Sequence, residues 1–253
     1  MRGPRAILIT GASSGIGEAL ALSYAAPGVL LALTGRDTAR LDAVVSACRA
    51  QGATVAAATI NAADASGMEA WIAEIDATRP IDLVIANAGI SAGTGGGTEG
   101  ADQTRQILRV NIEGVINTVL PLVPRMAARG RGQIALMSSM ASFRGVPGAA
   151  AYSASKAFVR VWGEALRLEL APSGVSVSVI CPGFVVSRIT AANKFTMPLL
   201  MPASRAAGII RRGLARNQAR IAFPWRIYAA VWLLAALPAT LVDPLFARLP
   251  RKG

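Results

Sequence analysis

Short apolar runs along this chain alternate with longer segments in which apolar residues recur every three or four positions. The runs are nearly continuously apolar, as expected of strands that are buried on both faces. Strands are predicted at residues 6–9, 29–34, 54–60, 83–86, 133–137, 175–180 and 220–224. Helices are predicted at residues 18–24, 41–48, 66–78, 102–120 and 150–170. This alternation predicts an α/β fold of three layers, a doubly wound parallel sheet of the Rossmann-like type, with ligands at the carboxyl ends of its strands.

A glycine-rich turn, TGASSGIG at residues 10–17, joins the first predicted strand to the first predicted helix. Gly11, Gly15 and Gly17 allow a tight turn and a close approach of the backbone to a ligand, and the following helix N-terminus suits a pyrophosphate. The spacing differs from the Gly-x-Gly-x-x-Gly of many dinucleotide sites. By itself, the pattern is equally typical of a purely structural turn.

Two further polar motifs fall at the same edge of the predicted sheet. Tyr152 and Lys156 begin a predicted helix, and their four-residue spacing places them on one face. A nearby ammonium stabilises a phenolate and lowers its pKa from about 10, so this pair could exchange protons. Ser139 directly follows the fifth predicted strand. In isolation, the pair is also typical of an exposed helical turn, and the serine of a strand end or helix cap.

Composition excludes several classes of protein. The chain has 253 residues, 53% of them hydrophobic, which suits one α/β domain over residues 1–224. It has no histidine, so Ser-His-Asp hydrolysis and His-ligated zinc are excluded. Cys48 and Cys181 have no paired or metal-like spacing, which indicates a reducing compartment. The N-terminus has no apolar signal region, and we expect a cytoplasmic protein.

The net charge of +12 is concentrated near the C-terminus. Residues 1–187 contain 15 Lys/Arg and 13 Asp/Glu, whereas residues 188–253 contain 11 and 1. The excess flanks apolar sequence and not a nucleic-acid motif, so we expect no nucleic-acid partner.

Residues 225–253 extend beyond the last predicted strand. Residues 227–242 are uncharged and contain Pro238, and they are fewer than the roughly 20 residues that a membrane span needs. Trp225, Tyr228 and Trp232 suit a membrane interface. The basic residues expected at lipid headgroups are Arg211, Arg212, Arg216, Arg220, Arg226, Arg248, Arg251 and Lys252. Two alternatives stay open: a peripheral contact at the inner face of the membrane, or a subunit contact in a homodimer or homotetramer.

Taken in order, these motifs resemble the short-chain dehydrogenase/reductase family, in its shorter branch of about this length. The resemblance covers residues 5–224 and rests on TGASSGIG at 10–17, NAG at 87–89, Asn111, Ser139 thirteen residues before Tyr152, the Tyr-xxx-Lys pair, and Pro182-Gly183. It implies that Tyr152 transfers the proton, Ser139 orients the carbonyl oxygen, and Lys156 holds the nicotinamide ribose and lowers the pKa of Tyr152. Asn111 would disturb its helix locally and link Lys156 to water. No metal is implied.

The resemblance also implies a set of cofactor-binding residues along the strand ends. Asn61 stands where the family commonly has aspartate, and Ser187 where threonine is usual, and both keep a hydrogen-bonding group. The full set is Gly11, Ser13, Ser14, Gly15, Ile16, Gly17, Arg36, Asn61, Asn87, Ala88, Gly89, Tyr152, Lys156, Pro182, Gly183, Val185 and Ser187.

The end of the second predicted strand indicates which nicotinamide cofactor is used. Gly35 stands where an acidic residue would bind both ribose hydroxyls, and Arg36 follows it. An arginine there favours a 2′-phosphate, so NADPH is predicted over NADH. Asp37 could act as an acidic selector or neutralise Arg36, and we favour its reading as a helix N-cap.

The expected activity is reversible reduction of a hydrophobic ketone or aldehyde with NADPH. Residues 184–202 are expected to form a lid, in which Phe195, Met197, Leu199, Leu200 and Met201 suit a bulky apolar substrate. The same side chains would also suit ordinary packing of a loop. A non-enzymatic NADP-binding regulator with this fold is the alternative.

Overall fold

A computed structural model of the chain describes residues 3–91, 97–191 and 196–247, apart from the side chains of residues 245 and 246. Its centre is a seven-stranded, fully parallel sheet in the order β3-β2-β1-β4-β5-β6-β7. The strands are β1 (Ala6–Ile9), β2 (Leu30–Thr34), β3 (Thr54–Ala58), β4 (Leu83–Ala86), β5 (Gly132–Met137), β6 (Val175–Pro182) and β7 (Arg220–Phe223). All seven predicted strands are confirmed, with ends that shift by up to two residues.

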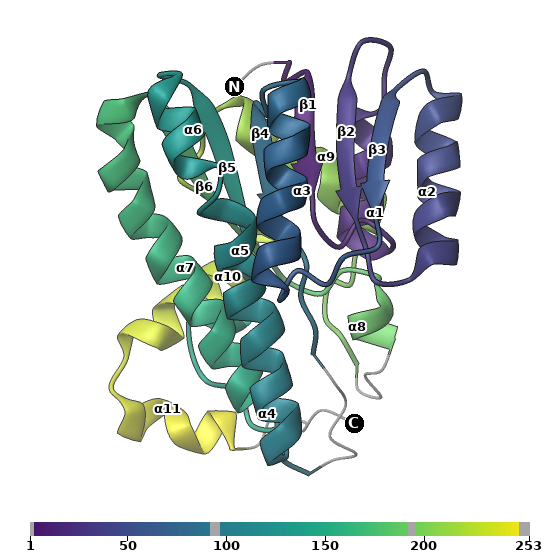
Figure 1. Cartoon of the computed structure of the whole chain (residues 1–253). Helices are drawn as coiled ribbons and strands as arrows, with labels where there is room; N and C mark the ends of the chain where they lie inside the picture. The colour runs from purple at the N-terminus through teal and green to yellow at the C-terminus, as the bar shows by residue number, and fades with distance from the viewer. Residues whose placement is uncertain (1–2, 92–96, 192–195, 248–253) are drawn as a thin grey trace.

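Helices cover both faces of the sheet (Figure 1). One face carries α1 (Gly15–Tyr24), α2 (Thr38–Ala50) and α9 (Ala203–Ala215). The other carries α3 (Ala65–Thr78), α5 (Gly114–Val119), α6 (Val123–Ala128) and α7 (Ala150–Leu170). The remaining elements are α4 (Ala101–Leu108), the π-helix η1 (Arg109–Glu113), the 3₁₀ helices η2 (Met140–Ser142) and η3 (Ala171–Ser173), α8 (Arg188–Ala191), α10 (Trp225–Ala236) and α11 (Ala239–Phe246).

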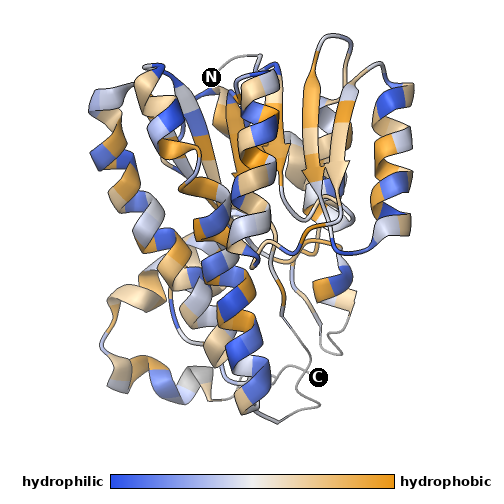
Figure 2. Cartoon of the chain, in the orientation of Figure 1, coloured by the Kyte–Doolittle hydropathy of each residue, from blue (hydrophilic) through white to orange (hydrophobic). Residues whose placement is uncertain are grey.

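Alternating residues of the strands supply two cores, one on each face. Ile7 and Ile9 pack with α1, α2 and α9, whereas Leu8 and Val84 pack with the helices of the opposite face. Figure 2 shows the strands mostly in the colours of apolar residues, and α2 and α3 in alternating bands of polar and apolar colour. The strand order reverses between β1 and β4, and such a switch point opens a crevice at the carboxyl ends of the strands.

Candidate active site

A cavity of about 560 Å³ lies at this edge, within the usual size range of ligand pockets. The predicted site residues on its wall are Gly11, Ser13, Ser14, Gly15, Ile16, Arg36, Asn61, Asn87, Ala88, Gly89, Ser139, Tyr152, Lys156, Pro182, Gly183, Val185 and Ser187. The structure thus brings together all but two of the residues predicted from the sequence. Gly17 and Asn111 lie behind this wall.

The glycine turn between β1 and α1 is fixed by close backbone packing. Gly11 and Gly15 have φ angles of +67° and +60°, which favour glycine. A Cβ on Gly17 would lie 2.3 Å from the carbonyl oxygen of Gly11. The packing of the turn therefore leaves no room for a side chain at Gly17, and its contact with the cofactor stays a prediction. Because Gly17 has no side chain, α1 can pack closely against the turn that follows β1.

Asn87 joins this turn to the end of β4. Its Nδ2 donates to the carbonyl oxygens of Thr10 (2.9 Å) and Gly11 (3.2 Å), so it ties the end of β4 to the turn after β1. Thr10 was not predicted, although its Oγ1 accepts from the backbone N–H groups of Asn87 and Ala88, both at 3.1 Å. Its position directly before the glycine turn was the available signal. The two residues lock neighbouring strand ends together beneath the cavity.

The end of β2 carries the arginine predicted to select the cofactor. Asp37 is the N-cap of α2, accepts from the Arg40 backbone N–H at 3.0 Å, and forms an ion pair with the Arg40 side chain at 2.7 Å. The N-cap reading is confirmed. Among the described residues, Arg36 has no acidic partner within 4.0 Å, and it lies exposed at the cavity rim. Gly35 is tightly packed, because a Cβ there would lie 2.8 Å from that of Ser13.

Ser139, Tyr152 and Lys156 converge at the opposite end of the cavity. The side chains of Ser139 and Tyr152 are hydrogen-bonded to each other. Ser139 is also the N-cap of η2, and its Oγ accepts from the Ala141 N–H at 3.1 Å. Lys156 is only 4% exposed, and its Nζ donates to the carbonyl oxygen of Met137 at 2.9 Å. The serine therefore both caps a turn and contacts the tyrosine, so the two readings of Ser139 are compatible.

Burial sets the acidity of both ionisable groups. Burial raises the pKa of Tyr152, and the hydrogen bond from Ser139 lowers it only in part. Burial lowers the pKa of Lys156 to about 8, against a smaller raising effect of Cys181. The implied lowering of the Tyr152 pKa by Lys156 is therefore not seen here, because the loss of solvation outweighs the hydrogen bond from Ser139. At neutral pH the tyrosine is protonated and the lysine is mostly charged.

Asn111 lies in η1, which confirms the predicted local disturbance of its helix. The side chain is fully buried. Its Oδ1 accepts from the Ile90 N–H at 2.7 Å, and its Nδ2 donates to the Ile90 carbonyl oxygen at 2.9 Å and to Ser155 Oγ at 3.0 Å. A Cβ on Gly89 would lie 3.2 Å from Lys156 Nζ and 3.3 Å from Asn111 Oδ1. Asn111 thus supports the lysine region from behind the wall, and the water link stays a prediction.

Glu99 is a functional neighbour that sequence reasoning missed. Its carboxylate accepts hydrogen bonds from the backbone N–H groups of Ala151 and Tyr152. The N-cap residue of α7, Ala149, provides no side-chain cap. Glu99 therefore satisfies free donors at the helix start and places a negative charge at its positive end. No local signal could have revealed it, since the cap is about fifty residues away in sequence.

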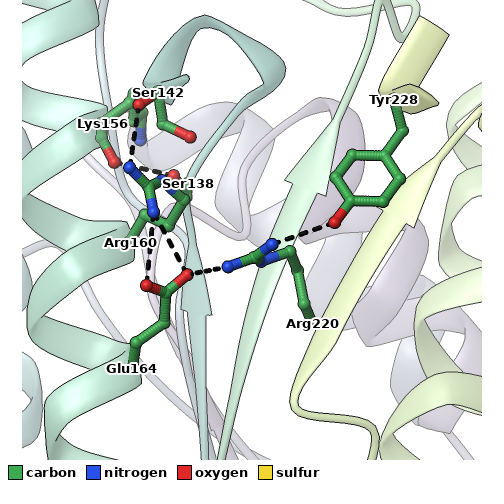
Figure 3. Close-up of polar contacts among 7 residues, drawn as sticks. All are labelled: Ser138, Ser142, Lys156, Arg160, Glu164, Arg220 and Tyr228. Atoms are coloured by element: carbon green, nitrogen blue, oxygen red, sulfur yellow. Dashed lines mark hydrogen bonds and ion pairs between the residues drawn. The ribbon is translucent and has the colours of Figure 1, made fainter. Parts of the chain in front are cut away.

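A polar network continues from this end of the site toward the C-terminal segment (Figure 3). Ser138 Oγ donates to the Lys156 carbonyl oxygen at 2.7 Å. Arg160 and Arg220 both bind Glu164, and Arg220 also binds Tyr228 OH at 2.9 Å. These contacts hold Arg220 within the fold. The prediction that Arg220 binds a lipid headgroup is therefore wrong.

Arg211 is exposed and also contacts α1, and its contact with a lipid headgroup stays a prediction. Arg211 lies 4.7 Å from the ring centroid of Tyr24 and donates to the Ser23 carbonyl oxygen. It therefore packs on α1, on the face of the sheet that α9 covers. Arg248, Arg251 and Lys252, together with Phe195, lie outside the described residues.

Comparison with known proteins agrees with this geometry. The model of the short chain dehydrogenase family matches residues 5–197. An uncharacterized oxidoreductase of Myxococcus xanthus is 39% identical over 246 residues, with 97% of each chain covered. The chain belongs to the short-chain dehydrogenase/reductase family. It is therefore an oxidoreductase that uses a nicotinamide cofactor.

Solved structures of this family share the whole fold. A short-chain dehydrogenase of Sphingobium yanoikuyae in complex with NADPH is 27% identical, with a TM-score of 0.79 over 96% of each chain. One of Burkholderia phymatum in complex with NAD is 25% identical, with a TM-score of 0.82 over 98% of this chain and 97% of that one. A bulky-bulky ketone specific alcohol dehydrogenase of Comamonas testosteroni is 25% identical, with a TM-score of 0.78 over 98% and 95%.

Proposed function

We propose that this short-chain dehydrogenase/reductase reduces a hydrophobic ketone or aldehyde with NADPH, reversibly. The observation that carries the proposal is the arrangement of one cavity. A glycine turn with Arg36 lies at one end, and Ser139, Tyr152 and Lys156 meet at the other. The first end suits a phosphorylated dinucleotide, and the second suits proton transfer to an oxygen.

The side chains divide the work of proton transfer. Tyr152, whose pKa is raised by burial, holds its proton at neutral pH and gives it to the carbonyl oxygen of the substrate. Ser139 donates a hydrogen bond to the same oxygen and fixes its place. Lys156, charged below pH 8, binds ribose hydroxyls and stabilises the phenolate that remains. NADPH, when bound, supplies the hydride.

The cofactor preference rests on the end of β2. Asp37 caps α2 and is ion-paired with Arg40, which supports Arg36 as the residue that selects the cofactor. An exposed guanidinium at the cavity rim favours a ribose 2′-phosphate through charge-assisted hydrogen bonds. NADPH is therefore the proposed cofactor, with NADH bound more weakly.

The substrate class rests on the segment over the cavity. Val185 pairs with Met201, and both are buried. Leu199 and Leu200 are exposed beside them. We propose that residues 184–202 form the lid, where flexible apolar side chains accept a bulky ketone. The bulky ketone specificity of the structural neighbour supports this class.

The test is Tyr152→Phe in the purified protein, with a panel of apolar ketones. Loss of the proton donor should lower kcat by about 10²- to 10⁴-fold, while the protein retains NADPH binding. Tyr24→Phe is the matched control, because Tyr24 lies under Arg211 on the far face of the sheet. Unchanged turnover in Tyr152→Phe would contradict the mechanism. Tight NADPH binding without reduction of any ketone would favour the non-enzymatic regulator.

A further inference from the structure

The C-terminal hairpin, defined as α10 and α11 joined at Pro238, presents an apolar face outward. None of the twelve residues of α10 is buried. Its exposed stripe follows helical spacing and consists of Trp225, Ala229, Trp232, Leu233 and Ala236. Trp225 is 70% exposed, Trp232 54% and Leu233 57%. This is the reverse of a soluble surface helix, whose apolar stripe faces the core.

Specific contacts fix the orientation of the hairpin. Tyr228 binds Arg220 and packs edge-on against Phe143, with ring centroids 5.6 Å apart. Asp243 of α11 forms an ion pair with Arg144 at 2.7 Å, and its neighbour Val242 is 2% exposed. The inward side is therefore tied to the loop that follows Ser139. These contacts hold both helices in place and leave the apolar stripe exposed. Figures 1 and 2 show the two helices at the C-terminal end of the chain, mostly in the colours of apolar residues.

The length of the hairpin excludes a transmembrane role for α10. Twelve residues of helix extend about 18 Å, whereas the hydrocarbon core is about 30 Å thick. Among the described residues, only the segment 101–128 is long and apolar enough to span a bilayer. Of an apolar 18-residue stretch within it, 44% is buried in the fold. That segment contains η1 and the helices that pack on the sheet.

The charge of the C-terminal segment distinguishes between two candidates for what covers the apolar stripe, a second copy of the chain and a lipid surface. Arg226 is the one charged residue from 225 to 242, Asp243 is paired with Arg144, and the sequence of residues 248–253 has three basic residues and no acidic one. A two-fold contact between two copies would bring these positive charges together. An anionic lipid surface would complement them.

We propose that the hairpin lies on an anionic lipid bilayer, with the side chains of Trp225, Trp232, Leu233 and Leu241 in its interface. Tryptophan suits this depth because its ring is apolar and its N–H can bind water. Arg226 then contacts headgroups at the rim. The proposal does not depend on the substrate or on the catalytic roles.

The experiment is flotation of the full chain with vesicles of phosphatidylcholine alone or mixed with phosphatidylglycerol. The wild type should bind the mixed vesicles and bind less as salt rises. The double variant Trp232→Ser/Leu233→Ser should bind at least about tenfold more weakly, because two apolar anchors are lost. Leu168→Ser is the matched control, since Leu168 is 77% exposed on α7, and it should bind like the wild type.

Two further readouts separate the outcomes. Circular dichroism and turnover of a soluble ketone should be unchanged in the double variant, so that failure of catalysis and failure of docking are distinguishable. Absence of wild-type binding to the mixed vesicles at low salt would overturn the proposal, as would equal binding by the double variant. A dimer that dissociates in the double variant, without vesicle binding, would assign the stripe to a subunit contact.

Discussion

The two ends of the cavity are built from different parts of the chain. The glycine end is formed mainly by backbone. At Gly17 and Gly35 the packing leaves no room for a side chain. The Tyr152 end consists of polar side chains, and the pKa values of Tyr152 and Lys156 are shifted in opposite directions. The first end is therefore sensitive to added volume, and the second to charge and pH.

The largest expected effect tests the glycine end of the cavity. Gly17→Ala should lower the free energy of unfolding by about 3 kcal/mol, because the new Cβ would lie 2.3 Å from the Gly11 carbonyl oxygen. Urea denaturation measures this change. Gly208→Ala in α9 is the control, since only Arg212 Nη1 lies within 4 Å, at 3.5 Å. It should leave stability within about 1 kcal/mol. Equal stability of both variants would show that the turn adapts.

The next largest effect tests the Tyr152 end of the cavity. Folded Lys156 has a pKa of about 8, and the unfolded side chain about 10.4. Between these values the unfolded state binds more protons, so this group makes the folded state more stable as pH rises. The stability of the wild type relative to Lys156→Met should therefore increase by about 2 kcal/mol from pH 8 to pH 10. Denaturation curves of both proteins across this range measure the difference, and a flat or falling difference would contradict the shift.

A smaller effect at the glycine end concerns the exposed Arg36. Arg36→Ala should weaken NADPH binding about tenfold and leave NADH binding unchanged, because it removes one charge-assisted contact with a 2′-phosphate. Titration by cofactor fluorescence measures both constants. Arg40→Ala is the comparison, since Arg40 is paired with Asp37 and its loss should change the selectivity less. Equal losses for the two cofactors in Arg36→Ala would contradict the assignment.

The smallest effect returns to the Tyr152 end. Glu99→Gln removes the negative charge at the start of α7 but keeps an acceptor for the Ala151 and Tyr152 N–H groups. We expect kcat to fall about two- to fivefold with the KM for cofactor unchanged, because the helix start that carries Tyr152 is held less firmly. Glu169→Gln, an exposed position at the other end of α7, is the control and should have no effect on kcat. A change in the KM for cofactor alone would argue against a positioning role.

Local patterns were sufficient to predict most of the architecture. The strands were found because a parallel sheet covered on both faces requires continuous apolar runs. Tyr152, Ser139 and the glycine turn were found because they sit at strand ends or helix starts, which meet at one edge of such a sheet.

Other features depend on residues that meet only in three dimensions. Thr10 and Asn87 are far apart in sequence, and so are Glu99 and Tyr152. The basic residues of the C-terminal quarter looked alike in sequence, but Arg211 lies over Tyr24 and Arg220 binds Glu164. Tyr24 and Glu164 lie too far from these arginines in sequence for a local pattern to reveal the contacts.

The sequence by itself determined the fold through the spacing of its apolar residues, and its ordered motifs, by their resemblance to a known family, implied most of the residues around the cavity. Only the tertiary structure decided that Gly17 packs against the turn, that burial raises the pKa of Tyr152, and that the tryptophans of α10 face outward. These properties depend on the distances and solvation that distant segments create when they pack together.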